Sequence, residues 1–183
     1  MIYSDDNDLH PPHDKSQQMK KELSPEEALY RAAALCSTAE RCKSEIEEKL
    51  SRWGISASET HRIVDRLEQE KYIDESRYCR SFVNDKIRFD HWGRIKITAA
   101  LRQKKINNEH IQAALSQIDE GYYRTLLQEI LTKKRSSLGN EESPANRAKL
   151  ARFAISRGFE PGLVFTLLDT TCNRNLYDDQ PST

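Results

Sequence analysis

The stretch IEEKLSRWGISASETHRIV, residues 46–64, decides the fold because its apolar pattern occurs three times in the chain. Apolar Ile46 and Leu50 are four positions apart, and Gly54, a helix-ending position, follows four positions later. Apolar Ile55 comes next, and an apolar pair begins eight positions after it, at residues 63–64. Residues 97–115 and 150–168 repeat these offsets without a gap, at intervals of about 50 residues. Unrelated amphipathic helices would drift out of register. The pattern therefore predicts a tandem array of helical units.

Composition favours an elongated, all-α protein. The 183 residues include 29 Lys and Arg, 29 Asp and Glu and only six glycines. A sequence so rich in charge predicts a thin, stretched core, as in repeat proteins. Strand signals such as period-2 alternation and Asn-Gly or Asp-Gly turns are missing. We expect three three-helix repeats between two disordered tails, with the boundaries 1–23, 24–73, 74–119, 120–172 and 173–183.

Local signals place nine helices in these repeats. Ser24, followed by Pro25 and Glu27, is typical of a capped helix start, and Asp74 predicts a second capped start. Gly54 predicts a left-handed helix end. The first expected helix begins near residue 24, and the ninth begins at Pro161. The seven helices between them are expected at about 42–53, 58–71, 75–87, 94–104, 108–118, 120–135 and 144–157.

Several classes of function are disfavoured. The longest apolar run, residues 32–36, is too short to span a bilayer, and the first residues do not resemble a signal peptide, so we expect a cytoplasmic protein with no membrane partner. The four cysteines form no CxxC pair, and His10 and His13 belong to no ligand set with the spacing of a metal site. No phosphate-binding loop, HExxH helix or GxSxG elbow is present. We therefore expect neither an enzyme nor a cofactor, metal or small-molecule substrate.

Charge is distributed unevenly along the chain. Residues 22–75 contain eight basic and thirteen acidic residues, whereas residues 80–105 contain eight basic and two acidic ones. Further basic residues cluster in the third repeat. These clusters are either solvated helix faces or a surface for phosphates or carboxylates that stacked repeats bring together. Trp92 either stacks on a partner or packs in the turn before residue 94. The candidate contacts are Arg80, Lys86, Arg88, Arg94, Lys96, Arg102, Lys104, Arg152 and Arg157.

The chain resembles the bacterial RecX family of RecA regulators over residues 24–169. The similarity lies in RCKSEIEEKLSRWGI, RIVDRLEQEKYIDESRYCRSFVNDKIR, WGRIKITAALRQKKI and RFAISRGFE, which occur in the family's order. It implies a curved array of three-helix repeats that binds RecA and the groove of its filament on single-stranded DNA, and that inhibits or modulates recombination. Lys71 and Lys105 replace glycines usual in the family, and Cys42 replaces a common serine cap, for which Thr38 or Ser44 could compensate. These departures predict altered local turns.

Two other functions remain open at this point. Each three-helix unit could be a degenerate helix-turn-helix that binds DNA directly and without RecA. Alternatively, the chain could be a helical scaffold whose acidic first repeat docks another protein.

Overall fold

The computed structural model describes residues 23–139 and 143–175, with side chains to residue 170. The described chain is all-helical, as predicted. The two tails expected from the sequence lie mostly outside the described residues. Leu23 is described, and residues 173–175 belong to the last helix. The helices are α1 (Pro25–Thr38), α2 (Lys43–Arg52), α3 (Ala57–Gln69), α4 (Glu75–Arg88), α5 (Arg94–Gln103), α6 (Asn108–Leu115), α7 (Glu120–Ser137), α8 (Pro144–Ser156) and α9 (Pro161–Asn175).

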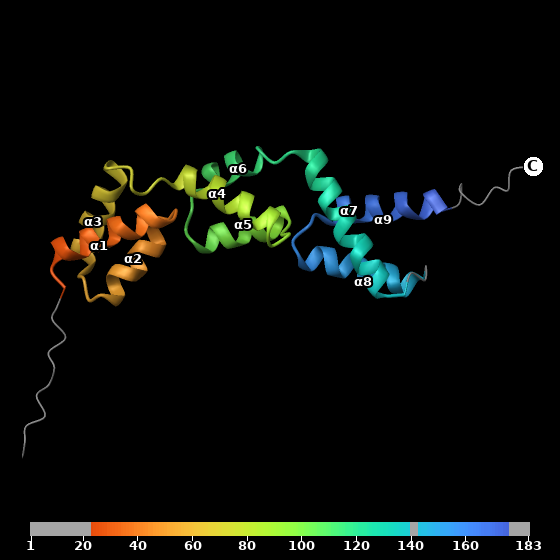
Figure 1. The fold of residues 1–183 in the computed structure, drawn as a ribbon, viewed down its shortest axis with the longest axis horizontal. Coiled ribbons are helices and arrows are strands. Elements are labelled where there is room, and N and C mark those ends of the chain that lie inside the picture. The colour runs from red at the N-terminus through yellow and green to blue at the C-terminus, as the bar shows by residue number, and fades with distance from the viewer. Residues whose placement is uncertain (1–22, 140–142, 176–183) are drawn as a thin grey trace, which may run out of the picture.

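Consecutive helices group into three units along one elongated axis (Figure 1). We call α1 to α3 repeat 1, α4 to α6 repeat 2, and α7 to α9 repeat 3. The contacts within these units join α1 and α2 to α3, α4 and α5 to α6, and α8 to both α7 and α9. This arrangement confirms the predicted array of three-helix repeats. No helix in the described part of the chain is long and apolar enough to cross a membrane.

The pattern repeated in the sequence is one helix-ending motif used three times. Gly54, Lys105 and Gly158 follow α2, α5 and α8 with φ values of 82°, 61° and 90°. The N–H group of the next residue then donates to the carbonyl group five positions back, at 3.1, 3.2 and 3.2 Å. This is the Schellman geometry, which satisfies carbonyls at a helix end. Lys71 is also left-handed, with φ 64°. The two lysines therefore keep the turn at a cost of about 1 kcal/mol each.

Helix starts follow the predicted caps, with one exception. Ser24 and Glu27 form a reciprocal capping box, and the Asp74 carboxylate accepts the backbone N–H of Arg77. At α2, however, Cys42 makes no capping hydrogen bond with its side chain. Ser44 does not compensate, because its hydroxyl donates to the carbonyl of Lys104 at 2.8 Å. The Thr38 hydroxyl donates to Leu35 at the end of α1. The start of α2 is thus held by contact with repeat 2.

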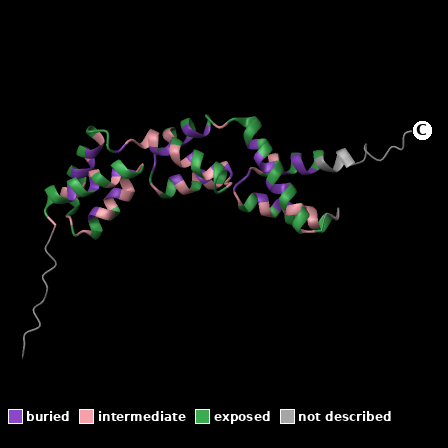
Figure 2. Ribbon diagram, viewed as in Figure 1, coloured by how far each residue is buried: buried purple, intermediate pink, exposed green. Residues whose placement is uncertain are grey.

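The apolar core is divided unequally among the repeats. Buried residues form narrow inner stripes throughout the array (Figure 2). Ile46, Leu50 and Leu67 belong to a cluster confined to repeat 1. A second cluster runs without interruption from repeat 2 through repeat 3, and from repeat 1 it takes only Cys42. Repeats 2 and 3 are therefore one packed body, whereas repeat 1 has a separate core.

Candidate functional site

The joint between repeats 2 and 3 is built from backbone atoms. The N–H of Gly93 donates to the carbonyl of Arg157 at 2.8 Å, and that of Ile95 donates to the carbonyl of Gly158 at 3.0 Å. A Cβ atom on Gly93 would lie 2.2 Å from the carbonyl carbon of Gly158, which no real contact allows. Such close approach is possible because Gly93 has no side chain. The joint thereby fixes α5 against the end of α8.

Arg94, a predicted contact residue, is a structural part of this joint. Its guanidinium donates to Glu160 at 3.3 Å and also pairs with Glu120. It lies 4.2 Å from the centre of the Tyr123 ring. The Tyr123 hydroxyl accepts the backbone N–H of Arg94 and donates to Glu160 at 2.8 Å. Burial raises the pKa of the Tyr123 phenol well above its usual range, so the phenol keeps its proton. These contacts account for Arg94 without any partner.

Lys104, at the end of α5, lies in the joint between repeats 1 and 2. Its ammonium group pairs with Glu45 of α2. The Glu45 carboxylate also accepts a hydrogen bond from the Tyr78 hydroxyl at 3.1 Å and lies 3.7 Å from Arg41. Burial disfavours the charged form of Glu45, but Lys104, Tyr78 and Arg41 outweigh it and hold the pKa of Glu45 below its usual range. This polar joint contrasts with the shared apolar core of repeats 2 and 3.

The joint between repeats 1 and 2 should therefore weaken in acid. A carboxyl group whose pKa is lowered by folding stabilises the protein at pH values above its unfolded-state pKa of about 4.3. This stabilisation is lost as the pH falls through the folded-state pKa. Glu45→Gln should be less stable than wild type at pH 7, and the difference should shrink as the pH falls through the lowered folded-state pKa of Glu45. Urea midpoints measured from pH 7 to pH 3 check this. Glu48→Gln, which removes an exposed carboxylate from the same helix, is the control. A Glu45→Gln effect independent of pH would contradict the expectation.

Basic and aromatic side chains from four helices flank the turn between α4 and α5. The Lys86 and Lys96 ammonium groups lie 4.9 and 4.2 Å from the Trp92 ring centre. Arg157 and Lys134 lie 4.9 and 5.4 Å from the Phe153 ring centre. We define the cation–aromatic surface as Lys86, Trp92, Lys96, Lys134, Phe153 and Arg157. Trp92 is half-buried and packs against the core, and cations lie over both aromatic rings.

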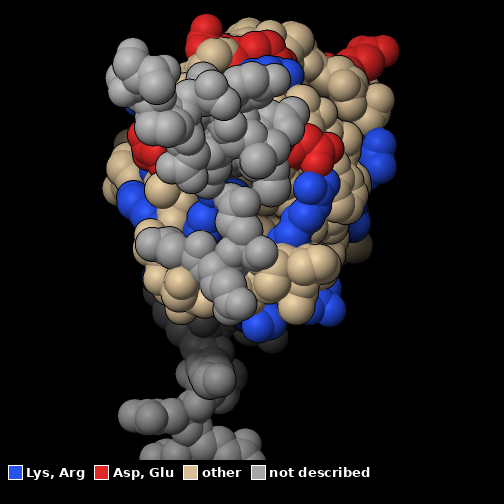
Figure 3. All heavy atoms as spheres, turned by 90° about the vertical axis from the view of Figure 1, so that its right-hand side faces the viewer, with Lys and Arg blue, Asp and Glu red and all other residues tan. Residues whose placement is uncertain are grey.

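The remaining predicted contacts, Arg80, Arg88, Arg102 and Arg152, are exposed. Arg80 and Arg102 make hydrogen bonds only within repeat 2, to Ser76 and Asn108. Arg88 lines a shallow pocket with Tyr122. In the view along the array, Asp and Glu atoms lie in the upper half of the visible described surface, and Lys and Arg atoms predominate below (Figure 3). The nine predicted residues therefore divide into two joint residues, three on the cation–aromatic surface and four exposed ones.

Sequence reasoning did not select Lys134 or Phe153 as candidate contacts. They lie on different helices, α7 and α8, and only packing within repeat 3 brings the lysine over the ring. The positive φ of His91, 54°, was not predicted either. This residue directly precedes Trp92 in the segment between α4 and α5, and its Nδ1 lies 3.3 Å from the carbonyl oxygen of Ile87. A sequence signal for this backbone conformation is missing, because the motif that ends the other helices is not repeated here.

Comparison with known proteins places the chain in a family. Residues 74–115, which cover α4 to α6, match the family model described as "RecX, second three-helix domain". The regulatory protein RecX of Herminiimonas arsenicoxydans is 32% identical over 133 residues, covering 70% of this chain and 82% of that protein. The chain belongs to the RecX family. The relatives of this chain are named regulatory protein RecX.

Solved structures of RecX proteins share the fold of this family member. RecX from Lactobacillus salivarius superposes with a TM-score of 0.72 at 18% identity, covering 80% of this chain and 95% of that one. Another structure of regulatory protein RecX gives a TM-score of 0.73 at 24% identity, covering 79% and 71%. At these identities the likeness concerns the fold alone. It supports the RecX arrangement of three helical repeats described above.

Proposed function

We propose that this RecX family protein is a non-catalytic, cytoplasmic regulator that binds RecA and its filament on single-stranded DNA, and that modulates recombinase and ATPase activity in DNA repair and recombination. Family membership supports the partner. The observation that carries the mode of binding is the cation–aromatic surface beside a rigid joint. Its cations stay in place because the shared core of repeats 2 and 3 fixes the elements that hold them.

The proposed contacts are the seven candidates outside the joints. Exposed Arg88, Arg102 and Arg152 can reach a partner without disturbing the fold, whereas Lys86, Lys96 and Arg157 are held over aromatic rings. Cations held in one position lose less side-chain entropy when they bind carboxylates or phosphates. An elongated body of this kind can contact neighbouring protomers in a helical filament. The acidic first repeat would then face a basic part of that filament.

Charge reversal tests the proposal. The triple variant Arg88→Glu, Arg102→Glu and Arg152→Glu should raise the concentration needed to inhibit DNA-dependent ATP hydrolysis by the cognate RecA by at least about tenfold, since each reversal replaces an attraction by a repulsion. The matched control carries Arg31→Glu, Arg52→Glu and Arg62→Glu, which make the same change in net charge at exposed sites of repeat 1. Inhibition that stays unchanged in a folded triple variant, or falls equally in both, would refute Arg88, Arg102 and Arg152 as partner contacts.

DNA binding in the absence of RecA separates the alternatives. A DNA-binding module acting alone would bind single-stranded DNA without RecA, and its affinity would fall steeply with salt. Nucleobases bind such modules by stacking on aromatic faces. Here cations already lie over the Trp92 and Phe153 rings, which favours contacts with acidic groups over base stacking. A scaffold docked through the acidic first repeat would bind its protein partner without DNA, and the control variant, which makes that repeat more acidic, would not weaken this binding.

A further inference from the structure

A basic pocket overlaps the cation–aromatic surface, where the turn before α5 meets repeat 3. Its apolar part consists of Leu126, Ile130 and Phe153, and its volume is about 280 Å³. Four residues capable of positive charge line it, namely His91, Lys133, Lys134 and Arg157. Glu129 is the only acidic residue in the lining. The pocket thus combines an apolar floor with an excess of positive charge.

The cations of this pocket are not neutralised within the described chain. None of the carboxylates there lies within ion-pair distance of Lys133, Lys134 or Arg157. Arg157 donates through Nη1 to the backbone carbonyl of Asp90 at 3.2 Å. Its Nε atom is buried and makes no hydrogen bond. Arg94 and Lys104 in the joints, by contrast, pair with carboxylates.

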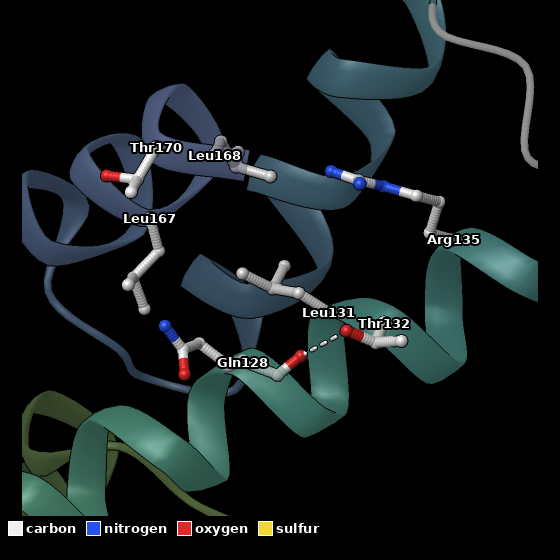
Figure 4. A pocket seen from close by; sticks show the side chains of 7 residues that line it. All are labelled: Gln128, Leu131, Thr132, Arg135, Leu167, Leu168 and Thr170. Carbon is white, nitrogen blue, oxygen red and sulfur yellow. Dashed lines mark hydrogen bonds between the residues drawn. The ribbon is translucent and has the colours of Figure 1, made fainter. Parts of the chain in front are cut away.

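A second pocket in the same repeat provides a contrast. It lies between α7 and α9, and Leu131, Leu167 and Leu168 form its apolar part (Figure 4). Arg135 is the only cation in its lining, and the Thr132 hydroxyl donates to the carbonyl of Gln128 at its edge. Apolar surface occurs in both pockets. The concentration of charge distinguishes the pocket at the joint.

The chemistry of the basic pocket limits its occupant. A small-molecule site usually has a volume of about 300–1,000 Å³, so this pocket suits one or two side chains better than a cofactor. The apolar floor favours an aliphatic or aromatic side chain, because burying it removes apolar area from water. The cationic rim favours carboxylates beside that side chain. A nucleobase would have to displace the cations that lie over Phe153.

We propose that this pocket binds a peptide segment of the protein partner in which an apolar side chain lies next to acidic residues. The apolar side chain contacts Leu126, Ile130 and Phe153, while its acidic neighbours pair with Lys133, Lys134 and Arg157. The proposal rests on the proposed function in taking the protein component of the filament as the partner. It adds the chemical class of the segment recognised and the place where it binds.

Peptide binding tests the proposal with the full chain. Overlapping fluorescent 15-residue peptides covering the cognate RecA are titrated with wild type and with Lys133→Glu/Lys134→Glu. The matched control, Arg124→Glu/Lys149→Glu, makes the same charge change at exposed positions of α7 and α8, the two helices that contribute Lys133, Lys134 and Phe153 to the pocket. Bound peptides should contain an apolar residue beside acidic ones. The pocket variant should weaken their binding at least about tenfold, and the control by less than about twofold. Replacing the apolar residue of a bound peptide with serine should also abolish binding.

The outcomes distinguish this proposal from the function on which it rests. If wild type inhibits ATP hydrolysis but no acidic peptide binds, or if pocket and control variants bind peptides equally, the pocket proposal is overturned and the function stands. If acidic peptides bind through Lys133 and Lys134 but wild type has no effect on RecA, the function fails and the pocket stands. A dT oligonucleotide that binds with the same dependence on these lysines, with no peptide bound, would overturn the pocket proposal in favour of nucleic acid.

Discussion

Gly93→Ala is expected to lower the free energy of unfolding by about 3 kcal/mol and the melting temperature by about 6–12 °C. The new Cβ would lie 2.2 Å from both the carbonyl carbon and oxygen of Gly158 and 2.3 Å from the backbone nitrogen of Phe159. These are backbone atoms, so no side chain can rotate away. The two repeats would have to separate locally, breaking the hydrogen bonds between Gly93 and Arg157 and between Ile95 and Gly158.

The control for this prediction is the same substitution at Gly162. That glycine lies in the first turn of α9, and a Cβ there would meet nothing within 4 Å. Alanine favours a helix over glycine by up to about 1 kcal/mol, so Gly162→Ala should be neutral or stabilising. Urea unfolding followed by Trp92 fluorescence in a Trp53→Phe background reports on the joint itself. Equal stability of the Gly93→Ala and Gly162→Ala proteins would contradict the closely packed joint.

Arg94→Ala is expected to destabilise the protein by about 2 kcal/mol, because it leaves the Glu120 and Glu160 carboxylates without their guanidinium partner and removes the cation over the Tyr123 ring. The side chains of Arg94 and Glu160 are only 21% and 34% exposed, so water replaces the lost pair incompletely. Removing the exposed Arg102 side chain should change stability by less than about 0.5 kcal/mol. Chemical denaturation of both variants provides the comparison.

A double-mutant cycle identifies the source of the Arg94 effect. Combining Arg94→Ala with Glu160→Gln should cost less than the sum of the two single changes, with a coupling of about 1–2 kcal/mol. Additive costs would exclude the pair as a source of stability. A stable Arg94→Ala protein that had lost inhibition of RecA would instead make Arg94 a partner contact, as the sequence alone predicted. The experiment therefore decides between the two roles of this residue.

The repeat architecture was predictable because it depends on short-range signals. The repeated spacing predicted helix ends at Gly54, Lys105 and Gly158, and all three have the left-handed conformation. The altered turn expected at Lys105 was wrong, because this lysine adopts the conformation that the two glycines have. The caps at Ser24 and Asp74 also formed as expected. By contrast, His91 was missed, and the start of α2 depends on a contact between Ser44 and Lys104 across the first joint. A contact across 60 residues of sequence has no local periodicity that could predict it.

The sequence by itself thus determined where helices begin and end, and that they form three repeats, because caps, turns and apolar faces involve residues within a few positions of one another. Only the tertiary structure decided which cations are paired within the fold. Arg94 pairs with carboxylates 26 and 66 residues away, and Lys104 with one 59 residues away, whereas Lys134 and Arg157 are brought together over the ring of Phe153. Charge in the sequence is a local property, but neutralisation of that charge depends on which distant side chains packing places beside it.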